Sequence, residues 1–99
     1  MRIFKKRFSL FDSALRSKPK IFPPARNTPE VILDRKGMIK MTGRLIPENA
    51  EEFFAPLEEW VNEYFCDPAE VTYIEISLEY INSTGSKYLF YLIHKIINI

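Results

Sequence analysis

Three sequence patterns predict a mixed α/β fold (α+β), with elements in the order strand, strand, helix, strand, helix. Residues 38–45 alternate in polarity after a Lys36-Gly37 turn, and residues 49–65 repeat apolar side chains at helical spacing. Residues 71–81 alternate again and lead through a polar segment into a second apolar helical run. The third strand and the helix that follows it form half of a βαβ unit.

The first two strands, residues 30–35 and 38–45, are predicted to form a β-hairpin. The first segment is apolar at its centre, and Lys36-Gly37 supplies turn residues. One face of the second segment consists of Ile39, Met41, Gly43 and Leu45. We expect this face to lie against the core, since an antiparallel strand can keep its other, more polar face in water.

The first helix is predicted to begin after Asn49, a good N-cap residue, and to end before Pro68. Glu51 and Glu52 follow in the first turn, where the helix dipole favours acidic residues. Its apolar stripe consists of Phe53, Phe54, Leu57, Trp60, Val61, Tyr64 and Phe65. We interpret the stripe as core packing, with a ligand groove as the alternative, and expect Pro56 to kink the helix or separate its first turn.

The third strand is predicted over residues 71–81. Its core face is expected to carry Ile74, Ile76, Leu78 and Tyr80. Residues 82–87 are polar and are interpreted as a tight turn, and residues 88–97 as the second helix. This helix is apolar nearly all round, which is typical of a helix with neighbours on several sides, so self-association through it is a further expectation.

The composition is that of one small globular domain. The chain has 99 residues, of which 46% are apolar and 27% charged, which argues against a disordered chain and against a large substrate-enclosing enzyme. No apolar run is long enough to cross a membrane. The single cysteine, Cys66, leaves neither an intramolecular disulfide nor a multi-cysteine zinc site, so a reducing, cytoplasmic location is expected.

The formal net charge of +1 conceals a division of the chain near Arg26. Residues 1–26 carry eight Lys or Arg and one acid, whereas residues 27–99 carry six bases and twelve acids. Prolines at the end of the first segment resist helix and sheet continuation. We therefore expect a flexible, basic N-terminal arm (residues 1–26) and an acidic domain (residues 27–99).

The N-terminal arm contains Phe4, Phe8, Phe11 and Leu15 at helical spacing, with basic residues off this stripe. A basic amphipathic segment can lie on an anionic membrane surface or bind nucleic acid without sequence specificity. A flexible tail with neither role is the simplest interpretation, and the alternatives stay open.

No residue pattern indicates catalysis or a metal site. His94 is the single histidine and has no readable partner, and Cys66, expected to be a small buried residue, has no nearby group to activate its thiol. The glutamates of the first helix lack the alternating spacing of a calcium loop. We therefore predict no enzyme activity, no metal and no cofactor.

The polar residues before the second helix carry the sharpest functional signal. Asn82, Ser83, Thr84 and Ser86 all favour a helix N-terminus, where free N–H groups and the helix dipole attract an anion. Capping alone is the simpler interpretation. The alternative is a phosphorylation site, since a phosphate of about −1.5 to −2 charges would be stabilised beside Lys87 and would alter a protein-binding surface.

Four segments, in order, resemble one protein family. They are NTPEVILD (27–34), GRLIPENA (43–50), EFFAPL (52–57) with Trp60, and LEYINSTGSK (78–87). Together they are similar to the SiaC family, bacterial regulatory phosphoproteins of the biofilm-regulation type. The resemblance covers residues 27–97 and implies a STAS-like mixed sheet, related to anti-sigma-factor antagonists, with helices mainly on one face.

The activity implied by the resemblance is binding without catalysis. Such proteins are controlled by a serine/threonine kinase of the histidine-kinase-like ATPase type and by a metal-dependent phosphatase. The unphosphorylated form engages a diguanylate cyclase in cyclic-di-GMP signalling. We therefore expect a phosphorylation-controlled protein-binding switch in a bacterial partner-switching pathway.

The family motif and the Asp-Ser-Ser/Thr-Gly motif of the antagonists both align the acceptor hydroxyl with Ser83, where the SiaC family has Thr. Thr84 is the alternative acceptor, and Gly85 replaces a family Ser. The resemblance implies a partner-binding surface made of Tyr80, Asn82, Ser83, Thr84, Gly85, Ser86 and Lys87.

Family members continue beyond the second helix with another strand and helix, which residues 27–99 are expected to lack. The alternative function is therefore a truncated remnant or interaction fragment that does not switch, associated with a membrane surface through the N-terminal arm.

Overall fold

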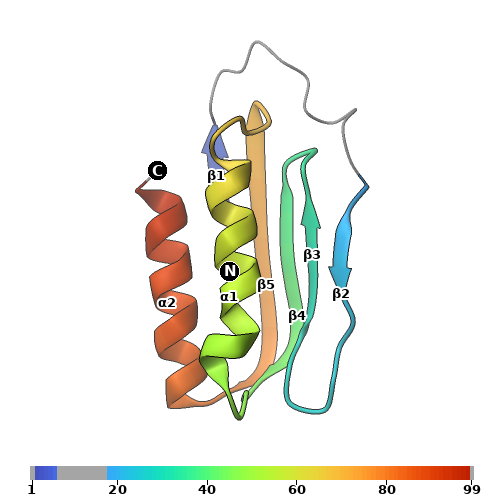
Figure 1. The fold of residues 1–99 in the computed structure, drawn as a ribbon, viewed down its shortest axis with the longest axis vertical. Coiled ribbons are helices and arrows are strands. Elements are labelled where there is room, and N and C mark those ends of the chain that lie inside the picture. The colour runs from blue at the N-terminus through green and yellow to red at the C-terminus, as the bar shows by residue number, and fades with distance from the viewer. Residues whose placement is uncertain (1, 7–17, 99) are drawn as a thin grey trace.

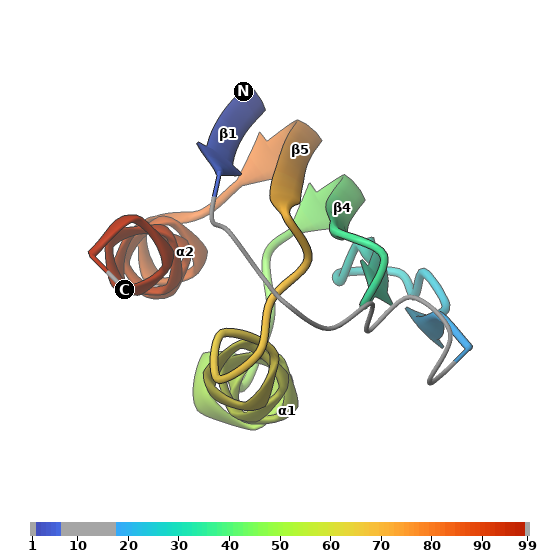
Figure 2. The same ribbon diagram turned by 90° about the horizontal axis from the view of Figure 1, so that it is seen from above.

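The computed structural model describes residues 2–6 and 18–98. Five strands form one mixed sheet in the order β1-β5-β4-β3-β2, and both helices lie on the same face of it (Figures 1 and 2), as predicted. The elements are β1 (Arg2–Lys6), β2 (Lys20–Phe22), β3 (Glu30–Asp34), β4 (Met38–Leu45), α1 (Ala50–Tyr64), β5 (Val71–Ile81) and α2 (Ser83–Ile97). The predicted order of strand, strand, helix, strand and helix is confirmed for the segment from β3 to α2.

β3 and β4 form the predicted hairpin. Gly37 closes the turn with a φ of 110°, and its N–H donates to the Asp34 carbonyl at 2.9 Å. The Asp34 carboxylate also accepts from the Lys36 N–H at 2.9 Å. The buried side chains of the hairpin are Val31, Leu33, Ile39, Met41 and Leu45. The alternation of β4 therefore predicts its buried face correctly.

α1 begins at the predicted cap. The side-chain oxygen of Asn49 accepts from the Glu52 N–H at 3.1 Å, and its side-chain nitrogen donates to the Glu52 carboxylate at 3.3 Å. The first bond satisfies one free backbone N–H at the helix start, and the second joins the two side chains. The helix is one continuous element through Pro56, which excludes the separated first turn.

α1 connects two neighbouring parallel strands, β4 and β5. The buried Tyr64 hydroxyl, at the end of α1, lies 2.8 Å from the Thr72 hydroxyl of β5 and accepts from the Ala69 N–H at 3.2 Å. These bonds hold the end of the helix, the following loop and the start of the strand together.

The core lies between the two helices and the face of the sheet that they cover (Figure 2). Its buried apolar residues are Val31, Leu33, Ile39, Met41, Leu45, Ala50, Phe54, Leu57, Val61, Tyr64, Phe65, Ile74, Leu89, Leu92 and Ile96. Most of the aromatic stripe of α1 is among them, which confirms its interpretation as core packing.

Two strands lie where a flexible arm is expected from the sequence. β1 pairs antiparallel with residues 71–75 of β5, and β2 pairs antiparallel with β3. Because Phe4 belongs to β1, the predicted helical stripe does not start there, and its other residues lie outside the described ones. β2 is a short edge strand between Pro19 and Pro23, which limit its length. The division of the chain near residue 26 stays a prediction.

Candidate functional site

β5 passes into α2 through one residue, Asn82, so the segment predicted as a turn over residues 82–87 is instead the cap and first turn of α2. Asn82 has an extended backbone, and its side-chain oxygen accepts from the Gly85 N–H at 2.7 Å. Its own N–H donates to the Leu45 carbonyl at 3.1 Å. This bond ties the start of α2 to the end of β4.

Ser83 and Thr84 occupy the first two positions of α2, and both are exposed. Neither hydroxyl has a hydrogen bond to another described residue. The first turn contains no acidic residue, and the exposed Lys87 lies one turn further along. A phosphate on either hydroxyl could therefore be stabilised in three ways: by free backbone N–H groups, by the positive end of the helix dipole and by a lysine.

Gly85 lies buried in the same turn, against the end of β4. A Cβ atom at this position would stand 2.8 Å from the Leu45 carbonyl oxygen and 2.9 Å from the Asn82 side-chain oxygen. Both distances are shorter than a carbon atom tolerates without movement of its neighbours. The close approach of α2 to β4 explains why this chain has glycine at this position. The next residue, Ser86, is exposed.

Tyr80 lies on a different side of the sheet from the one predicted. The register of β4 and β5 shifts by one residue after Gly43, so that Tyr80 pairs with the exposed Arg44 instead of continuing the buried row of Ile74. The Arg44 guanidinium carbon lies 4.9 Å from the centroid of the Tyr80 ring, which is 59% exposed. The strict alternation of the sequence gives no sign of this shift, so Arg44 is a neighbour of the site that sequence reasoning missed.

Ser83 and Thr84 begin two different stripes along α2. The stripe that starts at Thr84, here called the groove stripe, consists of Thr84, Tyr88, Tyr91 and Lys95. The stripe that starts at Ser83, here called the outer stripe, consists of Ser83, Lys87, Phe90 and His94. Since residues three and four apart share a helix face, the two candidate acceptors lie beside different surfaces.

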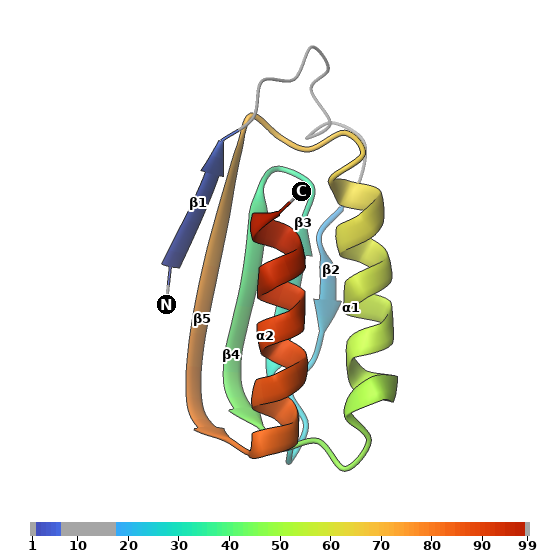
Figure 3. The same ribbon diagram turned by 90° about the vertical axis from the view of Figure 1, so that its left-hand side faces the viewer.

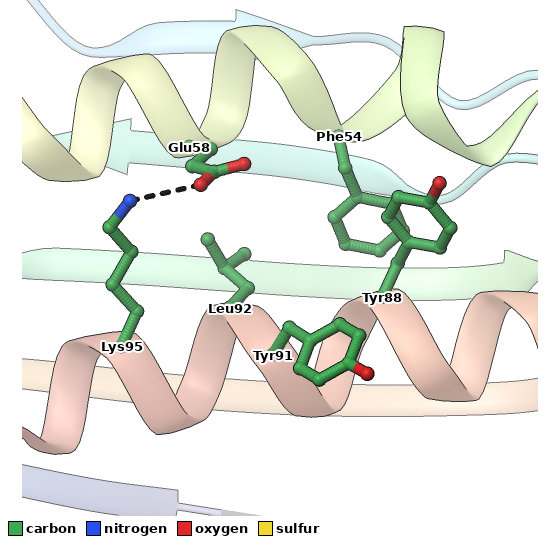
Figure 4. Close-up of a pocket in the computed structure, with 6 residues that line it drawn as sticks. All are labelled: Phe54, Glu58, Tyr88, Tyr91, Leu92 and Lys95. Carbon is green, nitrogen blue, oxygen red and sulfur yellow. Dashed lines mark hydrogen bonds and ion pairs between the residues drawn. The ribbon is translucent and has the colours of Figure 1, made fainter.

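A groove of about 240 Å³ lies between α1 and α2, beside the groove stripe (Figure 4). Its lining residues are Phe54, Glu58, Tyr88, Tyr91, Leu92 and Lys95. The Phe54 and Tyr88 rings stack with centroids 5.7 Å apart, and Lys95 Nζ lies 2.9 Å from Glu58 Oε1. Sequence periodicity assigns these residues to two separate helices and does not reveal the groove.

Two potentially reactive side chains, His94 and Cys66, lie among the described residues. His94 is exposed and stacks on Phe90, with ring centroids 5.9 Å apart. Cys66 is exposed, contrary to its expected burial, and its thiol donates to the Asn62 carbonyl at 3.3 Å. In residues 2–6 and 18–98, no three His, Cys, Asp or Glu side chains lie close enough together to hold a metal ion. The helices of the same segments are too short or too polar to span a bilayer.

A family model and the solved structures point to the same family. The family model of the SiaC family regulatory phosphoproteins matches residues 22–99. SiaC of Pseudomonas aeruginosa has a similar structure, with a TM-score of 0.64 and 26% identity over 74% of this chain and 61% of that one. A search of curated proteins finds no match.

A similar chain also occurs in the crystal structure of the diguanylate cyclase SiaD in complex with its activator SiaC from P. aeruginosa. It has a TM-score of 0.67 and 25% identity, over 76% of this chain and 62% of that one. The chain described here thus spans less than two thirds of the length of each of these two relatives.

Proposed function

The chain belongs to the SiaC family of regulatory phosphoproteins, and we propose that it acts as a phosphorylation-controlled protein-binding switch without enzyme activity of its own. Ser83 is the proposed acceptor, and Thr84 is the alternative. The proposed partner-binding surface is the junction of Tyr80 and residues 82–87.

The position of Ser83 carries this proposal. Its exposed hydroxyl stands at the first position of α2, where the helix dipole and the nearby Lys87 would stabilise a phosphate. A phosphate would add negative charge and bulk to a polar surface whose charged residue is Lys87. Partners that bind the unmodified turn would therefore lose affinity, and partners with arginine clusters would gain it.

The proposed partners follow from the family and from the structural relatives. SiaC of P. aeruginosa is an activator of the diguanylate cyclase SiaD. By this likeness we infer that the unphosphorylated chain binds a diguanylate cyclase in the cytoplasm. A kinase of the histidine-kinase-like ATPase type and a serine/threonine phosphatase would add and remove the phosphate.

The test is phosphorylation of the purified chain by a SiaC-pathway kinase of this ATPase type with Mg-ATP. The label is located by tandem mass spectrometry. We expect it on Ser83, and expect the Ser83→Ala variant to lose it, while the Ser86→Ala variant, changed in the same turn, keeps it. Label that persists in Ser83→Ala moves the acceptor to Thr84 or Ser86. A chain without label at all three hydroxyls favours the interaction fragment that does not switch.

A further inference from the structure

We propose that the groove between α1 and α2 receives an amphipathic helix of a protein partner, with the basic side of that helix facing α1. This inference rests on the proposed function as a protein-binding module, and it adds a second binding surface, with its chemistry, to the junction already proposed. It concerns residues outside the junction of β5 and α2, and its test is separate from that of the phosphate acceptor.

The shape of the groove suits a helix. α1 and α2 each contain 15 residues, lie side by side and run in the same direction (Figures 1 and 3). The helices that form the walls are each about 22 Å long at 1.5 Å per residue. The residues that line the groove lie within 54–58 of α1 and 88–95 of α2. Backbone groups inside a helix are already bonded, so these walls offer no strand edge to an extended peptide. A third helix can pack its side-chain ridge between two such walls.

The apolar lining provides an anchor point for a side chain of the partner. Tyr91 is 58% exposed at the edge of the groove, and Leu92 is buried at its base. Figure 4 shows Tyr88 opposite Phe54, with Tyr91 and Leu92 following along α2 toward the pair of Glu58 and Lys95. The volume of about 240 Å³ is below the roughly 300–1,000 Å³ of small-molecule sites, which favours side chains of a protein over a cofactor.

The charge on α1 determines the chemistry of the partner. α1 contains five glutamates, all exposed, and no lysine or arginine. Within the described chain, Glu58 is paired with Lys95 of α2, and Glu52 with the cap residue Asn49. Glu51, Glu59 and Glu63 are also exposed on α1, outside the residues that line the groove. A partner helix with lysine or arginine on the side facing α1 would complement this charge.

Two synthetic peptides test the occupant, each of about 15 residues to match the walls. Both carry leucines at i, i+4 and i+7, flanked on one side by lysines in the first peptide and by glutamates in the second. Fluorescence anisotropy with the full chain should show micromolar binding of the lysine peptide and at least about tenfold weaker binding of the glutamate peptide. The difference should shrink at high salt. Absence of lysine-peptide binding at about millimolar concentration, or equal binding of both peptides, overturns the proposal.

Neighbouring residues of α2 test the location. Tyr91→Ala should weaken lysine-peptide binding about tenfold, as removal of an aromatic anchor does. Phe90→Ala is the matched control, since Phe90 is 64% exposed on the outer stripe, and it should leave the affinity unchanged. Equal loss of affinity in both variants, or loss in Phe90→Ala alone, contradicts binding of the peptide in the groove and assigns the binding to the outer stripe. A chain that is labelled on Ser83 but does not bind the peptide contradicts this inference and leaves the proposed function standing.

Discussion

At the scale of single residues, Gly85 is the position of the site with the least freedom to change. Replacement by alanine would force a Cβ atom within 2.8 Å of the Leu45 carbonyl oxygen. The Gly85→Ala variant should therefore unfold about 1–3 kcal/mol more easily, although alanine favours a helix interior by about 1 kcal/mol over glycine. Urea denaturation measures the difference. Ser86→Ala, exposed in the same turn, should change stability by less than about 0.5 kcal/mol, and an equally small change in Gly85→Ala would contradict the close packing.

Residue roles were predictable from the sequence where they depend on near neighbours in the chain. Asn49 caps α1 through a residue three positions away, so local chemistry identifies it. At the start of α2, four residues have capping side chains, and only the geometry selects Asn82. The contact of Arg44 with Tyr80 depends on a register shift between two strands that are far apart in sequence, which alternation cannot show.

At the scale of elements, α2 begins five residues earlier than its apolar pattern predicts. Serine, threonine and glycine each favour a helix less than alanine does, so propensity alone places the start at Tyr88. Two contacts outweigh this preference. Asn82 caps the helix, and its N–H bonds to Leu45 of β4, so the first turn is held by the sheet as well as by its own sequence.

A negative charge at the start of α2 should stabilise the chain. Ser83→Asp places a carboxylate at the first position of a helix whose first turn has no acidic residue and whose dipole favours one. We expect an increase of about 0.3–1 kcal/mol in the free energy of unfolding at low salt, and less at high salt. Urea denaturation at both salt concentrations measures it, with Ser83→Ala as the uncharged control. Equal stability of the two variants at low salt would contradict the assumed effect of charge, including that of a phosphate.

At the scale of the whole molecule, the sheet joins segments of opposite charge. The basic β1 pairs with β5 of the acidic part of the chain, and Arg2 lies opposite Glu75 in the register. Neither β1 nor β2 was predictable. Both strands are short, the partner of β1 lies far away in the sequence, and no turn signal marks the connection between β2 and its partner β3. The hairpin, both helices and the long strand were predictable, since their periodicity is local and strong.

Removal of residues 1–17 should loosen one half of β5 and leave the other half unchanged. β1 covers residues 71–75 only, so the amides there that face β1 should exchange with solvent at least about tenfold faster in a chain that starts at Lys18. The control within the same strand is Ser77, Leu78, Tyr80 and Ile81, which pair with β4 in both chains. The free energy of unfolding should change little. The net gain of about 0.5–1.5 kcal/mol per hydrogen bond is offset by the cost of about 1–2 kcal/mol for ordering each residue of β1.

The exchange rate of each amide in β5 is measured by NMR spectroscopy in the two chains. Unchanged protection of residues 71–75 would show that β1 does not pair with β5 in solution.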